Sequence, residues 1–206
     1  MSYFPFFVEM QGLPVLIVGA GRIGMHKIKK LIGYGPRLTV VAKEIDKEAK
    51  EISDVTFVCR EFRDSDIDGM HFVIAATSDE ELNAHIYKLC CSRAIPVNVV
   101  DDKKKCSFIF PSVIKKGKLS IGISSGGASP AMTMLFADKI NSVIPDNIDS
   151  ILDYLESIRP KAKEMIDDNE QRSRFLSYMA QYTLAESRVP DEEETLEILN
   201  RFKKRG

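Results

Sequence analysis

The stretch "PVLIVGAGRIGMHKIKKL", residues 14–31, decides the fold of this chain. It opens with an apolar run, residues 14–20, that is typical of a strand buried on both faces of a sheet. Residues 22–34 follow with apolar side chains at helical spacing. Between strand and helix lies the pattern Gly-x-Gly-x-x-Gly, residues 19–24. A buried strand, a glycine-rich turn and a helix in this order predict the first unit of a dinucleotide-binding domain.

Each glycine of the turn has a separate expected role. Gly19 permits the tight turn, Gly21 lets a pyrophosphate approach the backbone, and Gly24 allows the helix to pack closely on the strand. The N–H groups at the start of the helix are then free to bind phosphate oxygens. We therefore expect a dinucleotide at this turn. The alternative is a tight turn that binds nothing.

The alternation of strands and helices continues toward the carboxyl terminus. Four short apolar runs, each bounded by polar or turn-forming residues, have the pattern of strands. One further segment has apolar residues at helical spacing. Such alternation predicts a parallel sheet covered by helices, and hence an α/β fold of the Rossmann type. The expected strands are residues 37–42, 55–60, 71–77 and 96–100, and the expected helix is residues 79–93.

The pattern changes after the fifth expected strand. Residues 107–124 have the pattern of two strands joined by a turn at Lys115–Lys118, in which Gly117 supplies the unusual dihedral angle. The loop that follows leads to Ser129, which we expect to cap a helix that begins with Pro130. The remaining chain has helical spacing, and the expected helices are residues 131–144, 146–166, 168–187 and 191–204.

Composition limits the classes of function. The 206 residues carry a net charge of −1, so no global field attracts nucleic acid or a membrane. The four cysteines show no zinc-finger spacing and the histidines, His26, His71 and His85, show no metal-ligand spacing, so we expect no metal site. The aromatic amino terminus has the pattern of a short strand rather than a signal peptide, and no apolar run is long enough to span a bilayer. We therefore expect a cytoplasmic protein.

A second polar stretch, "VNVVDDKKKCSFIFP", residues 97–111, ends the fifth expected strand. Asp101 comes directly after that strand, and open α/β sheets bind ligands at the carboxyl ends of their strands. A carboxylate in that place can accept a proton as a general base. The alternative is that Asp101 and Asp102 only cap a turn, and the residues alone favour that alternative.

Cations and a glycine-rich loop are candidates for binding an anionic substrate. One group of lysines follows the two aspartates and consists of Lys103, Lys104 and Lys105. A second group lies in the predicted hairpin, within residues 115–118. Ser124 and Ser125, with the amides near them, are suited to an anion nest. The alternatives are a solvated surface for the lysines and a glycine-rich entry to a helix for the serines.

The end of the second strand bears on the choice of cofactor. The acid that ordinarily binds the adenosine ribose is replaced there by Ala42 and Lys43, and Glu44 comes just after. Glu44 can still reach the ribose hydroxyls, which favours NAD, whereas Lys43 can accommodate the additional phosphate of NADP. The sequence favours NAD, and NADP stays open.

Three blocks of the sequence carry a family resemblance: "YFPFFVEMQGLPVLIVGAGRIGMHKIKKL" (3–31), "NVVDDKKKCSFIFPS" (98–112) and "SIGISSGGASPAM" (120–132). Together they resemble the precorrin-2 dehydrogenase/sirohydrochlorin ferrochelatase family, which includes the amino-terminal module of siroheme synthase. The resemblance implies an NAD-binding Rossmann domain, a β-hairpin dimerisation region and an α-helical carboxy-terminal region. Their expected ranges are 1–113, 114–145 and 146–206.

The resemblance also implies a reaction, the NAD-dependent oxidation of precorrin-2 to sirohydrochlorin, which some members follow with insertion of ferrous iron to give siroheme. The family's cofactor-contacting positions fall on Arg22, Ile23, Lys43 and Glu44. The catalytic aspartate falls on Asp101, and Asn98 opens the same motif. Asp102 stands where many relatives carry a neutral residue. We expect a homodimer with precorrin-2 and sirohydrochlorin as ligands, and no nucleic-acid or membrane partner.

A regulatory NAD-sensing module is the alternative from another class of protein. Such modules usually keep the acid at the end of the second strand and need no "NVVDD" block. Production of NADH from precorrin-2 separates the two hypotheses, because a sensor binds the cofactor without reducing it.

Overall fold

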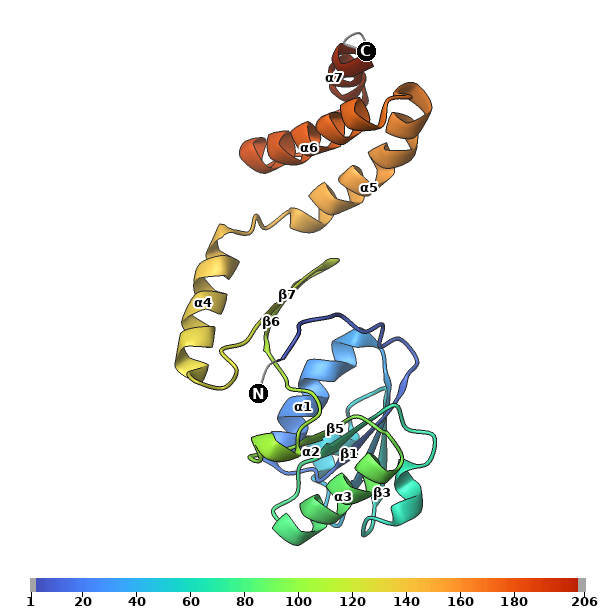
Figure 1. Cartoon of the computed structure of the whole chain (residues 1–206), viewed down its shortest axis with the longest axis vertical. Coiled ribbons are helices and arrows are strands. Elements are labelled where there is room, and N and C mark those ends of the chain that lie inside the picture. Colours follow the sequence, from blue (N-terminus) through green and yellow to red (C-terminus); the bar gives the residue numbers. More distant parts are fainter. Residues whose placement is uncertain (1–2, 204–206) are drawn as a thin grey trace. The chain divides into compact units, whose positions relative to one another are not determined.

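The computed structural model describes residues 3–203, apart from the side chains of Glu48 and Lys50. The described chain divides into two compact units, and the boundary lies between Phe110 and Pro111. Figure 1 shows a sheet with helices in the amino-terminal unit, and a hairpin with a series of helices in the carboxy-terminal unit.

A parallel sheet of five strands forms the amino-terminal unit, in the order β3-β2-β1-β4-β5. The strands are β1 (Pro14–Val18), β2 (Arg37–Ala42), β3 (Val55–Cys59), β4 (Phe72–Ala75) and β5 (Val97–Val99). The chain leaves β1 toward β2 and returns beside β1 with β4, so the strand order reverses between β1 and β4. Open α/β sheets bind ligands at this switch point.

Both faces of the sheet are covered. Along β1, Val15 and Ile17 belong to one apolar cluster with Ile28 of α1 (Arg22–Leu31). Leu16 and Val18 belong to another cluster with Ile86 of α3 (Glu80–Ser92). Neighbouring side chains alternate across a strand, so a run that is apolar throughout requires a cover on each side. The predicted α/β fold is confirmed by this arrangement.

Short helical segments complete the amino-terminal unit. The α-helix among them is α2 (Lys47–Lys50), and the 3-10 turns are η1 (Ile32–Tyr34), η2 (Asp64–Ile67) and η3 (Lys103–Lys105). The predicted helix over 22–34 therefore ends as an α-helix at Leu31 and continues as a 3-10 turn. Gly35 stops it in a left-handed conformation, with φ 69°.

The predicted strand at the amino terminus is not formed in the described part of the chain, because residues 3–10 belong to no strand. Pro5 lacks the N–H that pairing requires. Phe4, Phe6 and Phe7 are 83%, 72% and 78% exposed. The aromatic pattern was therefore a poor indicator of a strand, because these side chains find no apolar surface in their own unit.

The prediction of a strand from residue 107 is also wrong at its start, because β6 begins only at Ser112. Side chains hold the preceding segment against β5 instead. Ser107 Oγ accepts a hydrogen bond from the Val97 N–H at 2.7 Å, and Asn98 Nδ2 donates to the Phe108 carbonyl at 2.9 Å. This segment therefore belongs to the amino-terminal unit.

A hairpin and helices form the carboxy-terminal unit. Its elements are β6 (Ser112–Lys116), β7 (Leu119–Ile123), α4 (Pro130–Val143), α5 (Ile148–Met165), α6 (Asn169–Glu186) and α7 (Glu192–Lys203). Gly117 makes the antiparallel turn with φ 49°. Ser129 caps α4 by accepting a hydrogen bond from the Met132 N–H, as predicted. The expected end of the last helix at residue 204 lies outside the described residues.

The last three helices share a core. Phe175 and Met179 of α6 are fully buried against Ala162 of α5 and Leu199 of α7. This cluster removes apolar side chains of three helices from water, which stabilises the packing of α5, α6 and α7. Across the described chain, none of the helices has both the length and the apolarity that crossing a membrane requires.

Candidate active site

The glycine turn is shaped by close backbone contacts. Gly19 has φ 103°, and a Cβ added to it would lie 2.4 Å from the Ala76 carbonyl oxygen. A Cβ on Gly24 would lie 2.1 Å from the Gly19 carbonyl oxygen. A Cβ on Gly21, by contrast, would meet no atom within 4 Å. Gly19 and Gly24 therefore have no room for a side chain, and Gly21 leaves open space at the start of α1.

The start of α1 is prepared for an anion. Gly21 is the N-cap in an extended conformation, no side chain caps the helix, and no acid lies in its first turn. Arg22 is exposed and Ile23 is half-buried beside these free N–H groups. Unpaired N–H groups and the helix dipole favour a phosphate in this place.

The loop after β4 forms the other side of the switch point. Thr77 Oγ1 lies 2.8 Å from Asn83 Oδ1, and Asn83 Nδ2 donates to the Thr77 carbonyl at 3.0 Å. Asn83 is only 6% exposed, so these bonds fix the loop on α3. The sequence analysis did not single out this pair. Asp79 caps α3 by accepting a hydrogen bond from the Leu82 N–H, and an aspartate at the start of a predicted helix is the one local signal for this loop.

The end of β2 carries one cation between acids. Lys43 Nζ lies 3.1 Å from Glu61 Oε1, and both side chains are well exposed. Glu44 is also exposed and follows directly. The Glu61 carboxylate therefore neutralises the Lys43 ammonium, and Glu44 adds a further negative charge at the end of β2.

Asp101 lies at the carboxyl edge of the sheet, next to the turn that follows β4. The Val100 N–H donates to the Ala75 carbonyl at 3.0 Å, which aligns the end of β5 with the end of β4. Asp101 itself is exposed and has φ 61°, in the left-handed region that side chains with a Cβ seldom adopt. The glycine turn after β1 and Asp101 after β5 thus share one edge of the sheet.

Asp102 and the lysines after it form a closed turn. Asp102 caps η3 by accepting a hydrogen bond from the Lys104 N–H at 3.0 Å, and its other oxygen lies 2.7 Å from Lys105 Nζ. The hydrogen bond from Lys105 lowers the pKa of Asp102, and the same bond raises the pKa of Lys105. Lys103 and Lys104 are exposed on the same turn.

Asn98 is enclosed within the protein. It is 7% exposed, and its amide donates to the Phe108 carbonyl and lies 3.5 Å from Cys106 Sγ. The Cys106 thiol donates in turn to the Val99 carbonyl, and burial raises its pKa. Asn98 therefore fixes the chain that follows Asp101, and its contact with a substrate stays a prediction.

The candidate serines lie in the other unit. Ser124 Oγ accepts a hydrogen bond from the Gly126 N–H, and Ser125 Oγ accepts one from the Ser129 N–H at 3.0 Å. In the hairpin, Lys118 forms ion pairs with Asp153 and Glu156 of α5, and these pairs raise its pKa. The two serines thus stabilise the loop that precedes α4, and the Lys118 ammonium is paired with carboxylates of α5.

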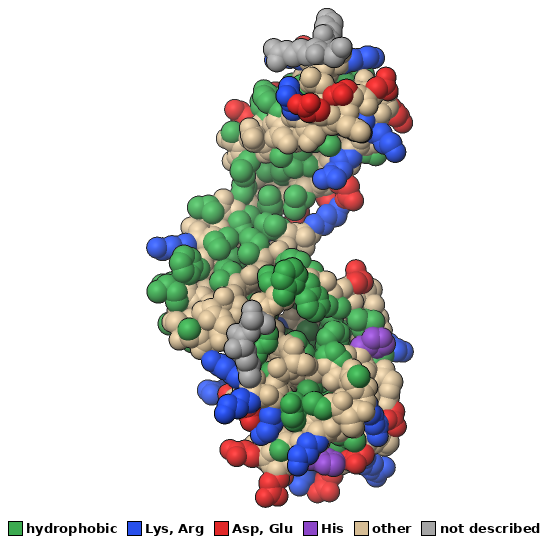
Figure 2. Space-filling view, viewed as in Figure 1, with side chains coloured by type: hydrophobic (Ala, Val, Ile, Leu, Met, Phe, Trp, Pro, Cys, Tyr) green, Lys and Arg blue, Asp and Glu red, His purple; other side chains and the backbone are tan. Residues whose placement is uncertain are grey.

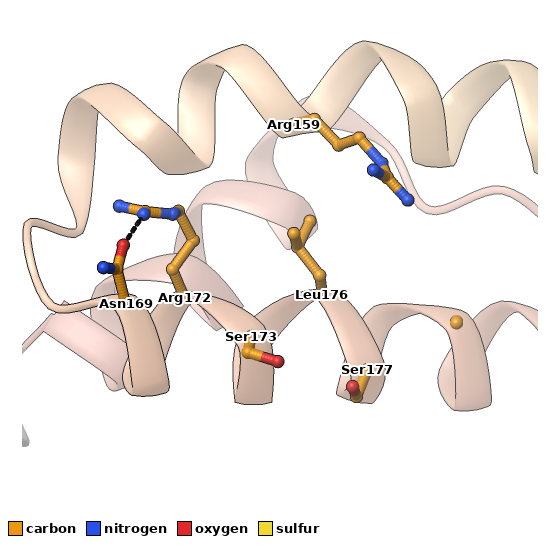
Figure 3. Close-up of a pocket in the computed structure, with 7 residues that line it drawn as sticks. Arg159, Asn169, Arg172, Ser173, Leu176 and Ser177 are labelled. Carbon is orange, nitrogen blue, oxygen red and sulfur yellow. Dashed lines mark hydrogen bonds between the residues drawn. The ribbon is translucent and has the colours of Figure 1, made fainter.

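Two hollows lie away from the predicted residues. One, of about 1120 Å³, lies at the amino ends of the strands, where Pro14, Arg37 and Val55 line it. That edge is opposite the glycine turn. The other, of about 440 Å³, lies between α5 and α6. Figure 3 shows Leu176 between Arg172 and Arg159 in this pocket. Arg172 donates to the Ile166 carbonyl at 2.8 Å, which ties α6 to the end of α5.

Among the described residues, no group of three or more His, Cys, Asp or Glu side chains lies together in a way that could hold a metal ion.

Residues 6–112 match a family described as putative NAD(P)-binding. The chain belongs to this family.

Similar proteins include three siroheme synthases. That of Ectopseudomonas mendocina (strain ymp) is 38% identical over 188 residues, which cover 91% of this chain and 41% of the relative. Siroheme synthase 2 of Aeromonas salmonicida (strain A449) is 36% identical, covering 85% of this chain and 37% of the relative. The siroheme synthase of Thioalkalivibrio sulfidiphilus (strain HL-EbGR7) is 38% identical, and the match covers 85% of this chain and 36% of the relative. The chain thus spans about two fifths of the length of these curated relatives.

A solved structure, SirC, precorrin-2 dehydrogenase, matches over 98% of this chain and 100% of that chain, with a TM-score of 0.73 and 20% identity. At this identity the likeness concerns the fold. It confirms the predicted succession of a Rossmann-type sheet, a hairpin and carboxy-terminal helices. The family resemblance drawn from the sequence is confirmed by these findings together.

Proposed function

We propose that this chain is a dehydrogenase that oxidises precorrin-2 to sirohydrochlorin with NAD, a step of siroheme biosynthesis. One observation carries the proposal. The glycine turn and Asp101 lie at the same edge of the sheet, so a cofactor bound at the first can place its nicotinamide near the second. The names of the relatives, siroheme synthase and precorrin-2 dehydrogenase, support the choice of substrate.

The proposed reaction balances with NAD as the oxidant and a carboxylate of the protein as the base. Oxidation of precorrin-2 removes a hydride, which passes to NAD and gives NADH, and a proton, which needs an acceptor. The Asp101 carboxylate is that acceptor, acting as a general base. Asp102 is held by Lys105 and the Lys104 N–H, so it is less suited to the task. The backbone N–H groups of Gly21, Arg22 and Ile23 hold the pyrophosphate, and Gly19 and Gly24 shape their turn.

NAD is the proposed cofactor in preference to NADP. At the end of β2 the Lys43 ammonium is paired with Glu61, and Glu44 adds a second carboxylate. Two acids and one cation leave a net negative charge where the additional phosphate of NADP would bind. The same carboxylate of Glu44 can accept hydrogen bonds from the ribose hydroxyls of NAD.

The proposed enzyme is a homodimer that uses α4 and the hairpin. Residue exposure supports this: Met134, Leu135, Phe136 and Val143 of α4 are 62%, 57%, 51% and 75% exposed. Figure 2 shows hydrophobic side chains gathered over this helix. The sheet of β6 and β7 has only two strands, which is marginal without further pairing or packing. A second copy of the chain, as the family resemblance implies, would cover both.

Insertion of ferrous iron into sirohydrochlorin is a second candidate activity. The insertion displaces protons from pyrrole nitrogens, and Asp101 is an exposed carboxylate at the proposed site that can accept them. The tetrapyrrole nitrogens would capture the iron. Formation of siroheme from sirohydrochlorin and ferrous iron, measured by absorbance above the uncatalysed rate, tests this activity separately.

An anaerobic assay tests the main proposal. Purified protein, precorrin-2 and NAD should give NADH, followed by its absorbance, together with sirohydrochlorin. A chain that binds NAD but forms no NADH would instead fit the alternative of a regulatory sensor.

A further inference from the structure

Lys27 occupies an unusual place for a cation. It lies in the middle of α1, it is half-buried, and its Nζ lies 3.9 Å from the centroid of the Phe110 ring. An ammonium over the face of an aromatic ring is attracted by the negative charge of that face. The Lys27 side chain is thus half-buried over Phe110, although the helical pattern of the sequence placed Lys27 outside the apolar face of α1.

The position of Phe110 is fixed by the fold. Phe110 packs on Phe108 with ring centroids 5.7 Å apart, and Phe108 packs edge-on against Phe72 of β4 at 5.4 Å. The Phe108 carbonyl also accepts the hydrogen bond from Asn98 of β5. Two neighbouring strands therefore hold the ring over which the Lys27 ammonium lies.

The titratable groups that act on Lys27 come from two elements. On its own helix are His26, Lys29 and Lys30, and the segment after β5 contributes the Asp101 carboxylate and the Cys106 thiol. Burial, followed by repulsion from Lys30, lowers the pKa of Lys27, while Cys106 and Asp101 act in the opposite direction. Burial also lowers the pKa of His26. The Asp101 carboxylate thus favours the charged form of Lys27.

The charge of Lys27 is not neutralised by a carboxylate of the described chain. Within residues 3–203 it forms no ion pair with a carboxylate at 4.0 Å or less. Lys105, by comparison, is paired with Asp102, and Lys118 with Asp153. A half-buried cation without a close carboxylate retains most of its capacity to bind an anion, because little of its charge is already neutralised.

We propose that Lys27 binds a carboxylate group of the substrate beside Asp101. The proposal rests on the proposed function, in which the substrate is a tetrapyrrole that carries acetate and propionate groups. The fixed ammonium would hold one such group on the α1 side of the proposed site, and this orients the ring carbon that loses hydride toward the nicotinamide. Lys27 would thus be a substrate-binding residue contributed by the helix that also binds the cofactor phosphate.

Binding of sirohydrochlorin, the proposed product, tests this without turnover. Lys27→Met keeps the hydrocarbon chain over Phe110 and removes the charge, whereas Lys27→Arg keeps the charge. Fluorescence titration should give a Kd about tenfold or more higher for Lys27→Met, since a hydrogen bond to a charged group is lost, and Lys27→Arg should recover most of the affinity. Lys29→Met, on the exposed side of the same helix, is the matched control and should bind like the unmodified protein.

Calorimetry with NAD completes the test. All three variants should bind NAD with unchanged affinity, and their thermal midpoints should stay within about 4 °C of that of the unmodified protein, since Lys27→Met loses only the contact with the Phe110 ring. An unchanged Kd for sirohydrochlorin in Lys27→Met would overturn the assignment of Lys27 alone, and so would an equal loss of NAD affinity, which would place Lys27 at the cofactor. If the unmodified protein failed to bind sirohydrochlorin, the proposed function would itself be wrong.

Discussion

The carboxylate of Asp102 lies 2.7 Å from the ammonium of Lys105, in the turn that follows β5. The preceding residue, Asp101, is exposed, and in the described chain it forms no ion pair at 4.0 Å or less. Two adjacent acids thus have different environments: one is neutralised within its own turn, and the other is exposed at the edge of the sheet where the glycine turn lies. This difference separates a structural carboxylate from a candidate base.

Asp101→Asn should abolish most of the dehydrogenase activity. Asparagine tolerates the left-handed conformation that Asp101 adopts, so the turn is kept while the proton acceptor is removed. Loss of a general base costs about a hundredfold to ten-thousandfold in rate, so kcat should fall by that factor. The affinity for NAD, measured by calorimetry, should not change.

Asp102→Asn is the matched control for that variant. It removes the ion pair with Lys105 but leaves Asp101 in place, and exposed pairs of this kind contribute about 0–1 kcal/mol to stability. Its kcat should stay within about threefold of the unmodified value, a factor that corresponds to less than 1 kcal/mol. An inactive Asp102→Asn beside an active Asp101→Asn would shift the proposed base by one residue.

Gly21→Asn should weaken cofactor binding without changing the fold. Gly21 has φ −68°, a Cβ there meets no atom within 4 Å, and asparagine is a favoured N-cap. The new side chain would take up the N–H groups that the pyrophosphate needs, so we expect NAD affinity to fall about tenfold or more. Calorimetry measures the affinity, and a thermal melt checks the fold.

Gly24→Ala serves as a contrast on the same turn. Its Cβ would lie 2.1 Å from the Gly19 carbonyl oxygen, so the helix would have to move and the thermal midpoint should fall. If Gly21→Asn bound NAD as tightly as the unmodified protein, the turn would be structural only.

Much of the amino-terminal unit could be predicted because its signals are local. The run from Pro14 to Val18, the glycine turn and the helix spacing of α1 each depend on neighbouring residues. The left-handed conformation of Asp101 gave no such signal, because aspartate adopts it only occasionally. The contact of Lys27 with Phe110 was also missed, because the two residues are distant in the sequence and meet only through tertiary packing.

The errors at the ends of elements have a similar physical origin. Aromatic residues favour strands, yet Phe4 and Phe6 are exposed, and Phe108 packs on Phe72 without entering a strand. Side-chain hydrogen bonds from Ser107 and Asn98 take the place of strand pairing there. Propensity alone cannot distinguish these outcomes, because they depend on which surface the ring meets.

Phe136→Glu should convert the proposed dimer to a monomer. Phe136 is 51% exposed on α4, and a carboxylate buried in an apolar interface costs several kcal/mol. Light scattering coupled to size-exclusion chromatography measures the mass. Leu184→Glu, at a residue that is 54% exposed on α6, is the control and should leave the mass unchanged. A monomeric unmodified protein at micromolar concentration would contradict the dimer.

Glu194→Gln should destabilise the carboxy-terminal unit in a manner that depends on pH. Hydrogen bonds from Arg188, and then from Tyr182, lower the pKa of Glu194 from 4.5 to about 2. The ionised carboxylate therefore stabilises the folded chain above about pH 4.5, and this contribution is lost as the pH falls toward 2.

Thermal melts of the unmodified protein and Glu194→Gln should thus differ at pH 7 and converge as the pH is lowered through that window. Glu193→Gln, exposed on the same helix, should show no such difference. A gap between the first two proteins that stayed constant with pH would mean that the ion pair with Arg188 does not contribute to stability.

A single-turnover experiment tests the central claim most directly. Enzyme in excess is mixed anaerobically with precorrin-2 and NAD, and NADH and sirohydrochlorin are quantified together. The unmodified protein should form one NADH for each sirohydrochlorin, and Asp101→Asn, although saturated with NAD, should form both at least about a hundredfold more slowly. If sirohydrochlorin formed without stoichiometric NADH, or if Asp101→Asn reacted at the unmodified rate, the proposed hydride transfer with Asp101 as base would be contradicted.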